Sequence, residues 1–230
     1  MIVPVGIPND FILILSGVSC VGKTTTAYNL LQKYPKFKRV SETDILRTML
    51  RAIVKDIETS ANCTDKINLR QRYAPLFESL KYCDMTTLKK QSQILSTYVK
   101  EIVKRQQDRK IPTIIEGANI VPSTYFYNGK PIDGFEKNIL FVNLFLSDEK
   151  EHLQRRLSRC KEREYANDFN LVQKQVVDIR KDKNNALHEE TLKLGECVNN
   201  VFSIDISNMS EGMVVDQIIS IITHISTTMD

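Results

Sequence analysis

Residues 17–24 of the chain are GVSCVGKT and match the pattern G-x-x-x-x-G-K-S/T at every fixed position. The apolar run FILILS at 11–16 precedes them, and a stretch typical of a helix begins at Lys23. Gly17 and Gly22 let the backbone curl so that its N–H groups face phosphate oxygens, and the helix adds the positive end of its dipole. This order of strand, loop and helix disfavours a chance match and predicts a site for the phosphates of a nucleotide.

Two side chains of this loop carry the chemistry expected of it. Lys23 would reach the β- and γ-phosphates, and the Thr24 hydroxyl would bind Mg²⁺. We expect Cys20 to be a small filler rather than a redox switch. The predicted nucleotide-binding residues of the loop are Gly17, Val18, Ser19, Cys20, Val21, Gly22, Lys23, Thr24 and Thr25. ATP and Mg²⁺ are the expected ligands, but kinases, GTPases and motor ATPases share this loop, so other residues must decide the reaction.

Outward from the loop, apolar runs alternate with helical stretches, which is typical of βαβ units and a parallel sheet. We expect strands at 11–16, 37–41, 112–116, 139–146 and 200–207, and helices at 23–33, 43–56, 85–108, 148–163, 168–194 and 210–225. Residues 63–82 are predicted to be partly helical, and 123–137 to be a loop with turns at Asn128-Gly129 and Asp133-Gly134. The pattern predicts one α/β domain over residues 1–230, with about five parallel strands and helices on both faces. A helical segment around 52–85 would lie on the acceptor side, and a helical lid around 148–170.

Composition narrows the class of protein. The chain has 230 residues, 42% of them hydrophobic, which is ordinary for a soluble globule. No apolar run approaches the roughly 18 residues of a membrane helix, and no Lys or Arg precedes the first apolar stretch, so we expect a cytoplasmic protein without a membrane partner. Five cysteines without a C-x-x-C pair, and three histidines away from ligand spacing, argue against a disulfide framework and a zinc site.

The net charge of the chain is +4. This suits an anionic substrate but is far weaker than the basic surface typical of a nucleic-acid-binding protein, so a nucleic-acid partner is not expected. A mixed, solvated surface would explain the charge equally well. A homo-oligomer stays open.

Charged residues follow the second predicted strand. Ser41-Glu42-Thr43-Asp44 ends that strand, and Arg47 and Arg51 lie four residues apart on the helix that follows. Ligands of open α/β sheets bind at the carboxyl ends of the strands, so Asp44 could accept a proton from an attacking hydroxyl or hold a metal shell. Asp44 could also cap the helix, and the two roles are compatible. The arginines could bind a phosphate or carboxylate of the acceptor, or form a solvated helix face.

The third predicted strand ends in Glu116-Gly117. An acid at the tip of a hydrophobic strand suits a group that binds Mg²⁺, often through water. Gly117 would leave room for a ligand to approach closely. The alternative is an exposed acid at a strand end.

Four arginines lie on the charged helix after the fourth predicted strand, at positions Arg155, Arg156, Arg159 and Arg163. Lid arginines of small-molecule kinases stabilise the transferring phosphoryl group, and lid closure excludes water. We expect Arg159 to be catalytic, and Arg155 and Arg163 to bind the nucleotide. The alternative is a surface helix with salt bridges to neighbouring glutamates.

Taken together, four segments resemble the archaeal-type 2-phosphoglycerate kinases, a branch of the phosphate-loop kinases. They are GVSCVGKTT at 17–25, ETDILR at 42–47, IIEGANIVP at 114–122 and DEKEHLQRRLSR at 148–159. Glu151, His152, Arg155 and Arg159 match that family's lid pattern EH-x-x-R-x-x-x-R, and Tyr165, Ile179 and Arg180 match its downstream part. The resemblance spans roughly residues 10–220 and implies a P-loop NTPase fold of the nucleoside-kinase-like type, with ATP-dependent phosphorylation of 2-phosphoglycerate.

Three residues depart from the family pattern. Asn119 replaces a histidine that would lie beside the acceptor pocket, Cys20 replaces a loop glycine, and Arg156 replaces an apolar residue. Other readings therefore stay open: a kinase of a nucleotide, a nucleoside or a nucleic-acid 5′ end, or a non-catalytic nucleotide switch. No N-K-x-D motif for guanine is present.

Specific roles follow from these patterns. The predicted catalytic residues are Lys23, Asp44, Glu116 and Arg159. The predicted metal ligands are Thr24 and Glu116. The predicted acceptor-binding residues are Asp44, Arg47, Arg51, Gly117 and Asn119.

Overall fold

The computed structural model describes residues 6–60, 62–80, 83–127, 130–132, 135, 138–162 and 169–228. A five-stranded parallel sheet forms its centre, with strand order β2-β3-β1-β6-β7. Its strands are β1 (Ile12–Ser16), β2 (Arg39–Glu42), β3 (Thr113–Gly117), β6 (Ile139–Phe145) and β7 (Val201–Asp205). Ser16 at the end of β1 is in register with Gly117 on β3 and Asn143 on β6, so the carboxyl ends of the three central strands form one edge.

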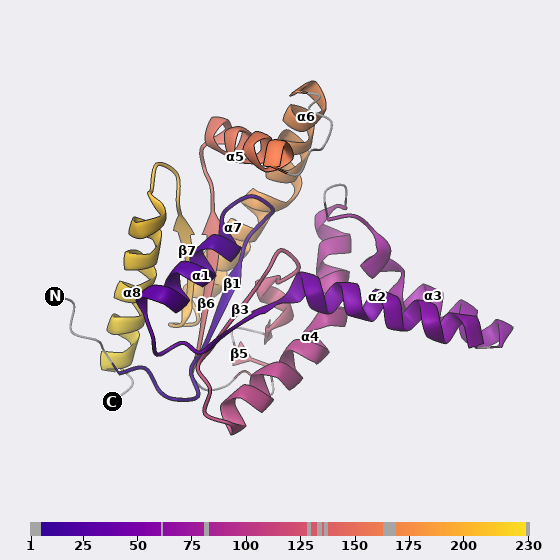
Figure 1. Ribbon diagram of the computed structural model, residues 1–230, viewed down its shortest axis with the longest axis horizontal. Helices are drawn as coiled ribbons and strands as arrows, with labels where there is room; N and C mark the ends of the chain where they lie inside the picture. The colour runs from indigo at the N-terminus through magenta and orange to yellow at the C-terminus, as the bar shows by residue number, and fades with distance from the viewer. Residues whose placement is uncertain are drawn as a thin grey trace.

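Alternating residues of β1 enter two different cores, because successive side chains of a strand point to opposite faces of the sheet. Leu13 and Leu15 belong to a core that also contains Leu30 of α1 (Lys23–Lys33) and Ile218 of α8 (Glu211–Thr228). Ile12 and Ile14 face the other way, toward a core with Val99 of α4 (Met85–Asp108). The sheet is therefore covered by helices on both faces, as predicted, and Figure 1 shows α1 and α8 on one side of it. Burial on both faces explains why these strands are near-continuous apolar runs.

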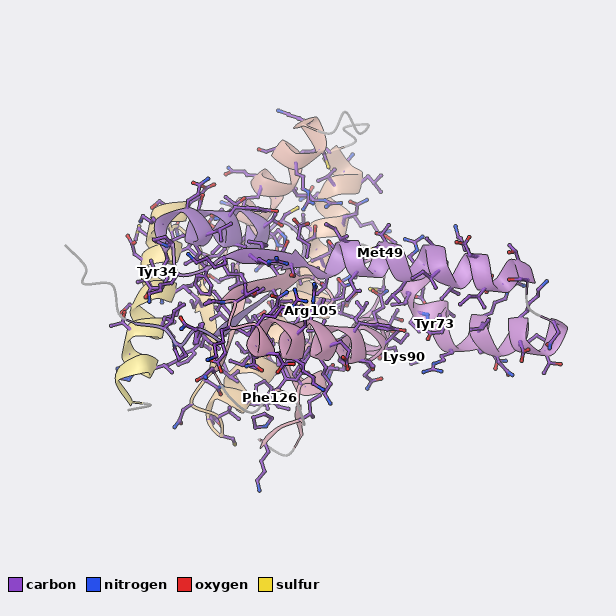
Figure 2. The ribbon with its side chains drawn as sticks, turned by 60° about the horizontal axis from the view of Figure 1, so that its bottom comes forward. Tyr34, Met49, Tyr73, Lys90, Arg105 and Phe126 are labelled. Carbon is purple, nitrogen blue, oxygen red and sulfur yellow. The ribbon has the colours of Figure 1, made fainter. Side chains whose placement is uncertain are left out.

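Two helices extend beyond the sheet on the side of β2. α2 (Thr43–Ser60) and α3 (Cys63–Phe77) run side by side away from the body of the protein, as Figures 1 and 2 show. Leu50 of α2, Leu76 of α3 and Leu95 of α4 form a small core at their base. This arrangement places the start of α2 at the carboxyl edge of the sheet.

The charged helix α5 (Glu149–Glu162) starts just beyond β6 and packs on α6 (Phe169–Ile179). A π-helical turn, Arg180–Asn184, joins α6 to α7 (Asn185–Gly195). The prediction of one long helix over 168–194 is therefore confirmed in extent, and the structure adds a π-helical turn inside it. The turn coincides with two buried polar residues, Lys183 and Asn184, whose side chains bind main-chain carbonyls elsewhere.

Other boundaries also differ from the predictions. Pro122–Thr124 forms a 3₁₀ turn, and β4 (Phe126–Tyr127) pairs antiparallel with β5 (Lys130–Pro131), in a region predicted to be a loop. The buried rings of Tyr125 and Phe126 anchor that region, and the pattern of the turn residues did not reveal this. The turn signals at Asn128-Gly129 and Asp133-Gly134 lie outside the described residues. Within the partly helical prediction, α3 ends at Phe77, two residues after Pro75.

Among the described helices, none combines the length and apolar character needed to span a bilayer. That the whole chain forms one domain stays a prediction.

Candidate active site

The phosphate loop lies between β1 and α1, where the sequence predicts it. Gly17 has φ +140°, and a Cβ atom at this position would lie 2.5 Å from the carbonyl oxygen of Leu144 on β6. Only glycine therefore fits where the loop leaves the sheet. Cys20 also has a left-handed backbone, with φ 70°. A cysteine adopts this conformation at some cost in strain.

Lys23 lies at the start of α1 beneath the loop and is 8% exposed. Its Nζ atom donates a 3.0 Å hydrogen bond to the carbonyl oxygen of Val18. Burial lowers the pKa of Lys23. The nearby carboxylates of Glu116 and Asp44 act in the opposite direction but do not cancel the effect of burial, so the pKa stays below its ordinary value. The ammonium group is thus held inside the loop, and facing carboxylates compensate part of its desolvation cost.

Thr24, in the first turn of α1, and Glu116, near the end of β3, face each other. The hydroxyl of Thr24 donates a 2.7 Å hydrogen bond to Oε1 of Glu116. Burial raises the pKa of Glu116, whereas Lys23 and the Thr24 hydroxyl lower it. A hydroxyl and a carboxylate are hard oxygen ligands and fit Mg²⁺, which usually keeps several waters and shares phosphate oxygens. Within the described ranges no group of three or more His, Cys, Asp and Glu side chains could hold a metal by itself, so this pair is the candidate.

Asp44, Arg47 and Arg51 lie on the first three turns of α2. Thr43 opens the helix directly after β2, so Asp44 lies in the first turn rather than at the cap position, where its charge still suits the helix dipole. Arg47 donates from Nε to the carbonyl oxygen of Leu76 (2.9 Å) and from Nη2 to that of Glu78. The Arg51 guanidinium lies over the Phe77 ring, 5.3 Å from its centroid. These contacts hold the end of α3 against α2.

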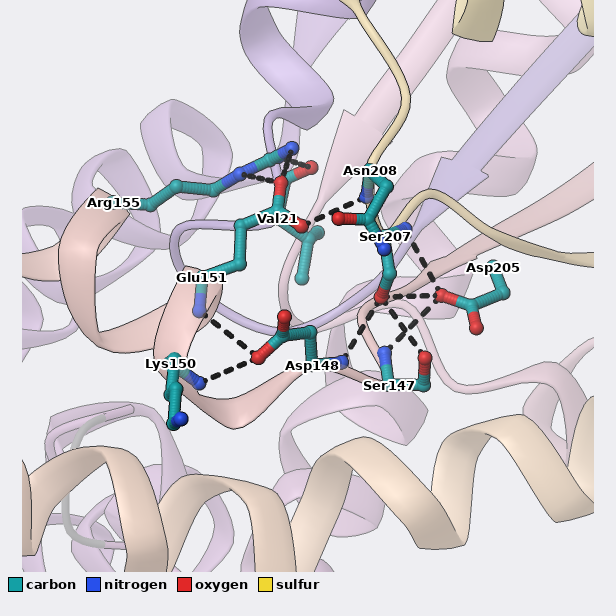
Figure 3. Close-up of polar contacts among 9 residues, drawn as sticks. All are labelled: Val21, Ser147, Asp148, Lys150, Glu151, Arg155, Asp205, Ser207 and Asn208. Carbon is teal, nitrogen blue, oxygen red and sulfur yellow. Dashed lines mark hydrogen bonds and ion pairs between the residues drawn. The ribbon is translucent and has the colours of Figure 1, made fainter.

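The side chains of α5 lie over the phosphate loop. Arg155 forms an ion pair with Glu151 at 2.6 Å and donates from Nη1 to the carbonyl oxygen of Val21 at 3.3 Å. The second carboxylate oxygen of Glu151 accepts a 2.9 Å hydrogen bond from the main-chain N–H of Asn208. Figure 3 shows this chain of contacts running from the loop after β7, through α5, to the phosphate loop. Nη1 of Arg159 lies 4.0 Å from the sulfur of Cys20.

One cleft of about 330 Å³ brings many of these groups together, although Arg155 and Glu151 are not part of its lining. Its lining residues come from the phosphate loop and the start of α1, from α2, from the end of α3 and the residues after it, from the end of β3 and from helix α5: Ser19, Lys23, Thr24, Asp44, Arg47, Arg51, Phe77, Ser79, Leu80, Glu116, Ala118, Arg156, Arg159 and Cys160. A larger groove of about 580 Å³ lies between α3 and α4, but its lining residues include none from the phosphate loop or the strand ends. The chemistry of the chain therefore belongs to the smaller cleft.

Comparisons with known proteins agree with this geometry. The chain is 24% identical over 226 residues to a 2-phosphoglycerate kinase of Methanococcus maripaludis, covering 90% of this chain and 69% of that protein. It is 25% identical over 156 residues to a 2-phosphoglycerate kinase of Methanococcus vannielii, covering 66% of this chain and 48% of that protein. A solved shikimate kinase from Acinetobacter baumannii superimposes with a TM-score of 0.50 over 95% of this chain and 94% of its own, at 14% identity. No protein-family model matches the chain.

This chain has the fold of a phosphate-loop kinase. The predicted fold class is confirmed, and so is the resemblance to 2-phosphoglycerate kinases.

Two predicted acceptor residues of this chain lie differently from expectation. A Cβ atom on Gly117 would lie 1.7 Å from Oγ1 of Thr43, so the space beside this glycine is taken by the start of α2 and not kept for a ligand. Asn119 is wholly buried and does not line the cleft, whereas its neighbour Ala118 does. Neither polar atom of the Asn119 side chain has a hydrogen-bond partner among the described residues. Direct contact between Asn119 and an acceptor therefore finds no support in the lining of the cleft.

Arg163, predicted to bind the nucleotide, lies outside the described residues, as does Tyr165. Arg156 takes a place that the sequence did not predict. It is 5% exposed and reaches Ser19 Oγ (3.4 Å), Cys20 Sγ (3.7 Å) and Gln175 Oε1 (3.2 Å). Its spacing of three residues from Arg159 could have indicated that both share a helix face.

His152 is a second residue whose role was missed. It is fully buried, and its Nε2 atom lies 2.9 Å from the carbonyl oxygen of Ser19. Because a carbonyl only accepts, Nε2 carries the hydrogen and the imidazole is the donor. Burial lowers the pKa of His152 to about 4, and the charge of Arg180 adds to this effect. His152 is therefore a neutral donor that holds the phosphate loop, and only its match to the family's lid pattern indicated it in the sequence.

Proposed function

We propose that this chain transfers the terminal phosphoryl group of ATP to a small anionic acceptor, and that 2-phosphoglycerate is the first acceptor to test. One observation carries the proposal: a single cleft joins the phosphate-binding residues Lys23 and Thr24 to an acid, Asp44, and to four arginines. The sequence similarity to 2-phosphoglycerate kinases supports the choice of acceptor.

The nucleotide side of the cleft follows from the phosphate loop. The main-chain N–H groups of the loop and the ammonium group of Lys23 would bind the phosphates. Thr24 and Glu116 would hold Mg²⁺, which neutralises phosphate charge when bound. Lys23 would exchange its bond to the Val18 carbonyl for phosphate oxygens, which are stronger acceptors.

The acceptor side of the cleft begins at Asp44. This carboxylate is exposed at the start of α2. It is suited to orient an acceptor hydroxyl and to take up its proton as phosphoryl transfer proceeds. The four arginines outnumber the two carboxylates, Asp44 and Glu116, that share the lining. This excess of positive charge favours an acceptor that brings negative groups of its own.

Helix α5 supplies the groups nearest the transferring phosphoryl group. Arg156 and Arg159 project toward the loop around Cys20, where a γ-phosphate would enter their reach. Guanidinium groups in such a place stabilise the charge of the transition state, and positioning and charge neutralisation account for most of the rate of phosphoryl transfer.

A panel of acceptors in a coupled ADP-release assay tests the proposal. We expect turnover with 2-phosphoglycerate, and a loss of about 100-fold or more in Lys23→Met. The panel also contains glycerate, shikimate, nucleosides, nucleoside monophosphates and an oligonucleotide with a free 5′-hydroxyl. Turnover with the nucleosides, nucleotides or oligonucleotide alone would replace the proposed acceptor class. Tight ATP binding with no acceptor-dependent ADP release would indicate a nucleotide switch instead.

A further inference from the structure

The π-helical turn Arg180–Asn184 lies outside the cleft but carries two buried polar side chains. Lys183 is 4% exposed and Asn184 is 2% exposed. Single π-helical turns within helical segments occur frequently at functional sites, because the wider turn redirects side chains that a regular helix would place elsewhere.

Lys183 crosses to the far wall of the cleft. Its Nζ atom donates hydrogen bonds to the carbonyl oxygens of Leu80 (2.9 Å) and Cys83 (2.7 Å). Leu80 and its neighbours Phe77 and Ser79 line the cleft, whereas Lys183 itself does not. We call the segment 75–80, together with Cys83, the acceptor wall.

Two other elements hold the same wall from the opposite side. Arg47 of α2 donates to the carbonyl oxygens of Leu76 and Glu78. Gln91 of α4 donates from Nε2 to the carbonyl oxygens of Pro75 (2.7 Å) and Glu78 (3.2 Å). The main chain of the acceptor wall leaves helical geometry after Phe77, so its carbonyls have lost their regular partners and are satisfied by these side chains.

The π-helical turn also binds the main chain just before α5. Arg180 donates to the carbonyl oxygens of Leu146 (2.7 Å) and Ser147 (2.8 Å), and Asn184 donates to that of Leu146 (3.1 Å). Helix α5 begins two residues later, at Glu149. One short turn thus connects the acceptor wall to the start of the helix that carries the cleft arginines.

Burying an ammonium group costs desolvation free energy, which an apolar side chain of similar length in the same place would not lose. Burial lowers the pKa of Lys183, while Cys83 and nearby aspartates raise it in opposition. Both hydrogen bonds of Lys183 end on main-chain carbonyls of one segment. Lys183 therefore does more than fill space: its two hydrogen bonds fix the position of the acceptor wall.

We infer that Lys183 is a positioning residue for the acceptor, which fixes the acceptor wall in the cleft relative to the base of α5. The inference rests on the proposed function. It adds that Phe77, Ser79 and Leu80 of the acceptor wall determine how the acceptor binds. The nucleotide phosphates would bind at the phosphate loop, whereas both hydrogen bonds of Lys183 end on the acceptor wall, so we expect nucleotide binding to be independent of Lys183.

The test compares Lys183→Met with wild type and with Lys181→Met, an exposed lysine of the same turn. KM and kcat are measured for 2-phosphoglycerate and for ATP by ADP release. We expect Lys183→Met to raise KM for 2-phosphoglycerate about tenfold or more, with KM for ATP within about twofold. Lys183→Arg, which keeps a cationic donor, is expected to recover most of that loss, and Lys181→Met to behave as wild type.

Several outcomes would overturn the inference. One is an unchanged KM for 2-phosphoglycerate in Lys183→Met. Another is a rise in KM for ATP as large as the rise in KM for 2-phosphoglycerate, because a general loss of structure would weaken the binding of both substrates. If Lys183→Met does not fold, Lys183→Gln, which keeps a shorter neutral donor, takes its place under the same criteria. An absence of acceptor-dependent ADP release in wild type would instead refute the proposed function, and the inference with it.

Discussion

The imidazole Nε2 of His152 and the carbonyl oxygen of Ser19 are 2.9 Å apart, although 133 positions separate the two residues in the chain. This bond joins helix α5 to the phosphate loop at the residue before Cys20. Arg155 and Arg156 of the same helix reach Val21 and Ser19. The base of α5 is thus part of the phosphate site, and the shape of the loop depends on it.

His152 should make folding stability depend on pH. The folded state takes up a proton on His152 only near pH 4, because burial lowers its pKa, whereas the unfolded chain takes one up near 6.5. The unfolded state therefore binds more protons in between, and stability is lost as the pH falls from about 6.5 toward 4. The shift corresponds to roughly 3 kcal/mol. Urea unfolding at pH 7 and pH 4.5 measures it.

The variant His152→Gln keeps a donor but cannot titrate, so it should lose that part of the pH dependence. His224→Gln, an exposed histidine on α8, is the matched control and should keep it. Equal pH dependence in wild type and His152→Gln would show that His152 is not held neutral by burial.

The Thr24–Glu116 pair should govern the dependence on Mg²⁺. Thr24→Val removes the hydroxyl ligand and Glu116→Gln replaces the charged carboxylate by a neutral amide. We expect each variant to need about tenfold more Mg²⁺ for half-maximal activity and to lose about 100-fold in kcat. Because burial raises the pKa of Glu116, activity should also fall as the pH drops through that raised pKa, and this acid limb should be missing in Glu116→Gln. Glu42→Gln, at the end of β2, serves as the control. A Mg²⁺ titration that is unchanged in both variants would refute the assignment.

Substitution of Arg159 and of Arg155 should change different kinetic constants. Arg159 lines the cleft, so Arg159→Met is expected to lower kcat about 100-fold or more with little change in KM for ATP. Arg155 instead binds Glu151 and the Val21 carbonyl, so Arg155→Met should mainly raise KM for ATP. Steady-state kinetics separate the two. If Arg159→Met changes KM for ATP and leaves kcat as in wild type, it binds the nucleotide and does not act in transfer.

Gly117 should be required for packing. In Gly117→Ala the added methyl group would overlap Oγ1 of Thr43, and we expect a loss of about 1–3 kcal/mol in the free energy of unfolding. Thr43→Ala removes the overlapping hydroxyl, so the double variant should recover part of that loss. Chemical denaturation of the four proteins of this double-mutant cycle measures the coupling. Additive losses would show that the two positions do not compete for the same space.

The local parts of the protein were predictable from the sequence. Continuous apolar runs identified the central strands, because a parallel sheet covered on both faces leaves no room for polar alternation. The glycines and Lys23 of the phosphate loop identified a phosphate site, because its geometry depends on a few adjacent residues. Asp44, Glu116 and Arg159 were predicted from their places at strand ends and on the charged helix, and the structure brings all three to one cleft.

Tertiary structure alone decided which side chains meet across long separations. Arg156 is a departure from the family pattern in sequence, yet in the structure its side chain reaches from α5 to Cys20 in the phosphate loop. Gly117 accommodates Thr43, and Lys183 satisfies carbonyls at Leu80 and Cys83, about a hundred positions away. Local patterns reflect which residues fit a strand, a helix or a loop. A buried polar group, in contrast, takes whichever partner the packing of distant segments presents to it, and no spacing along the chain encodes that choice.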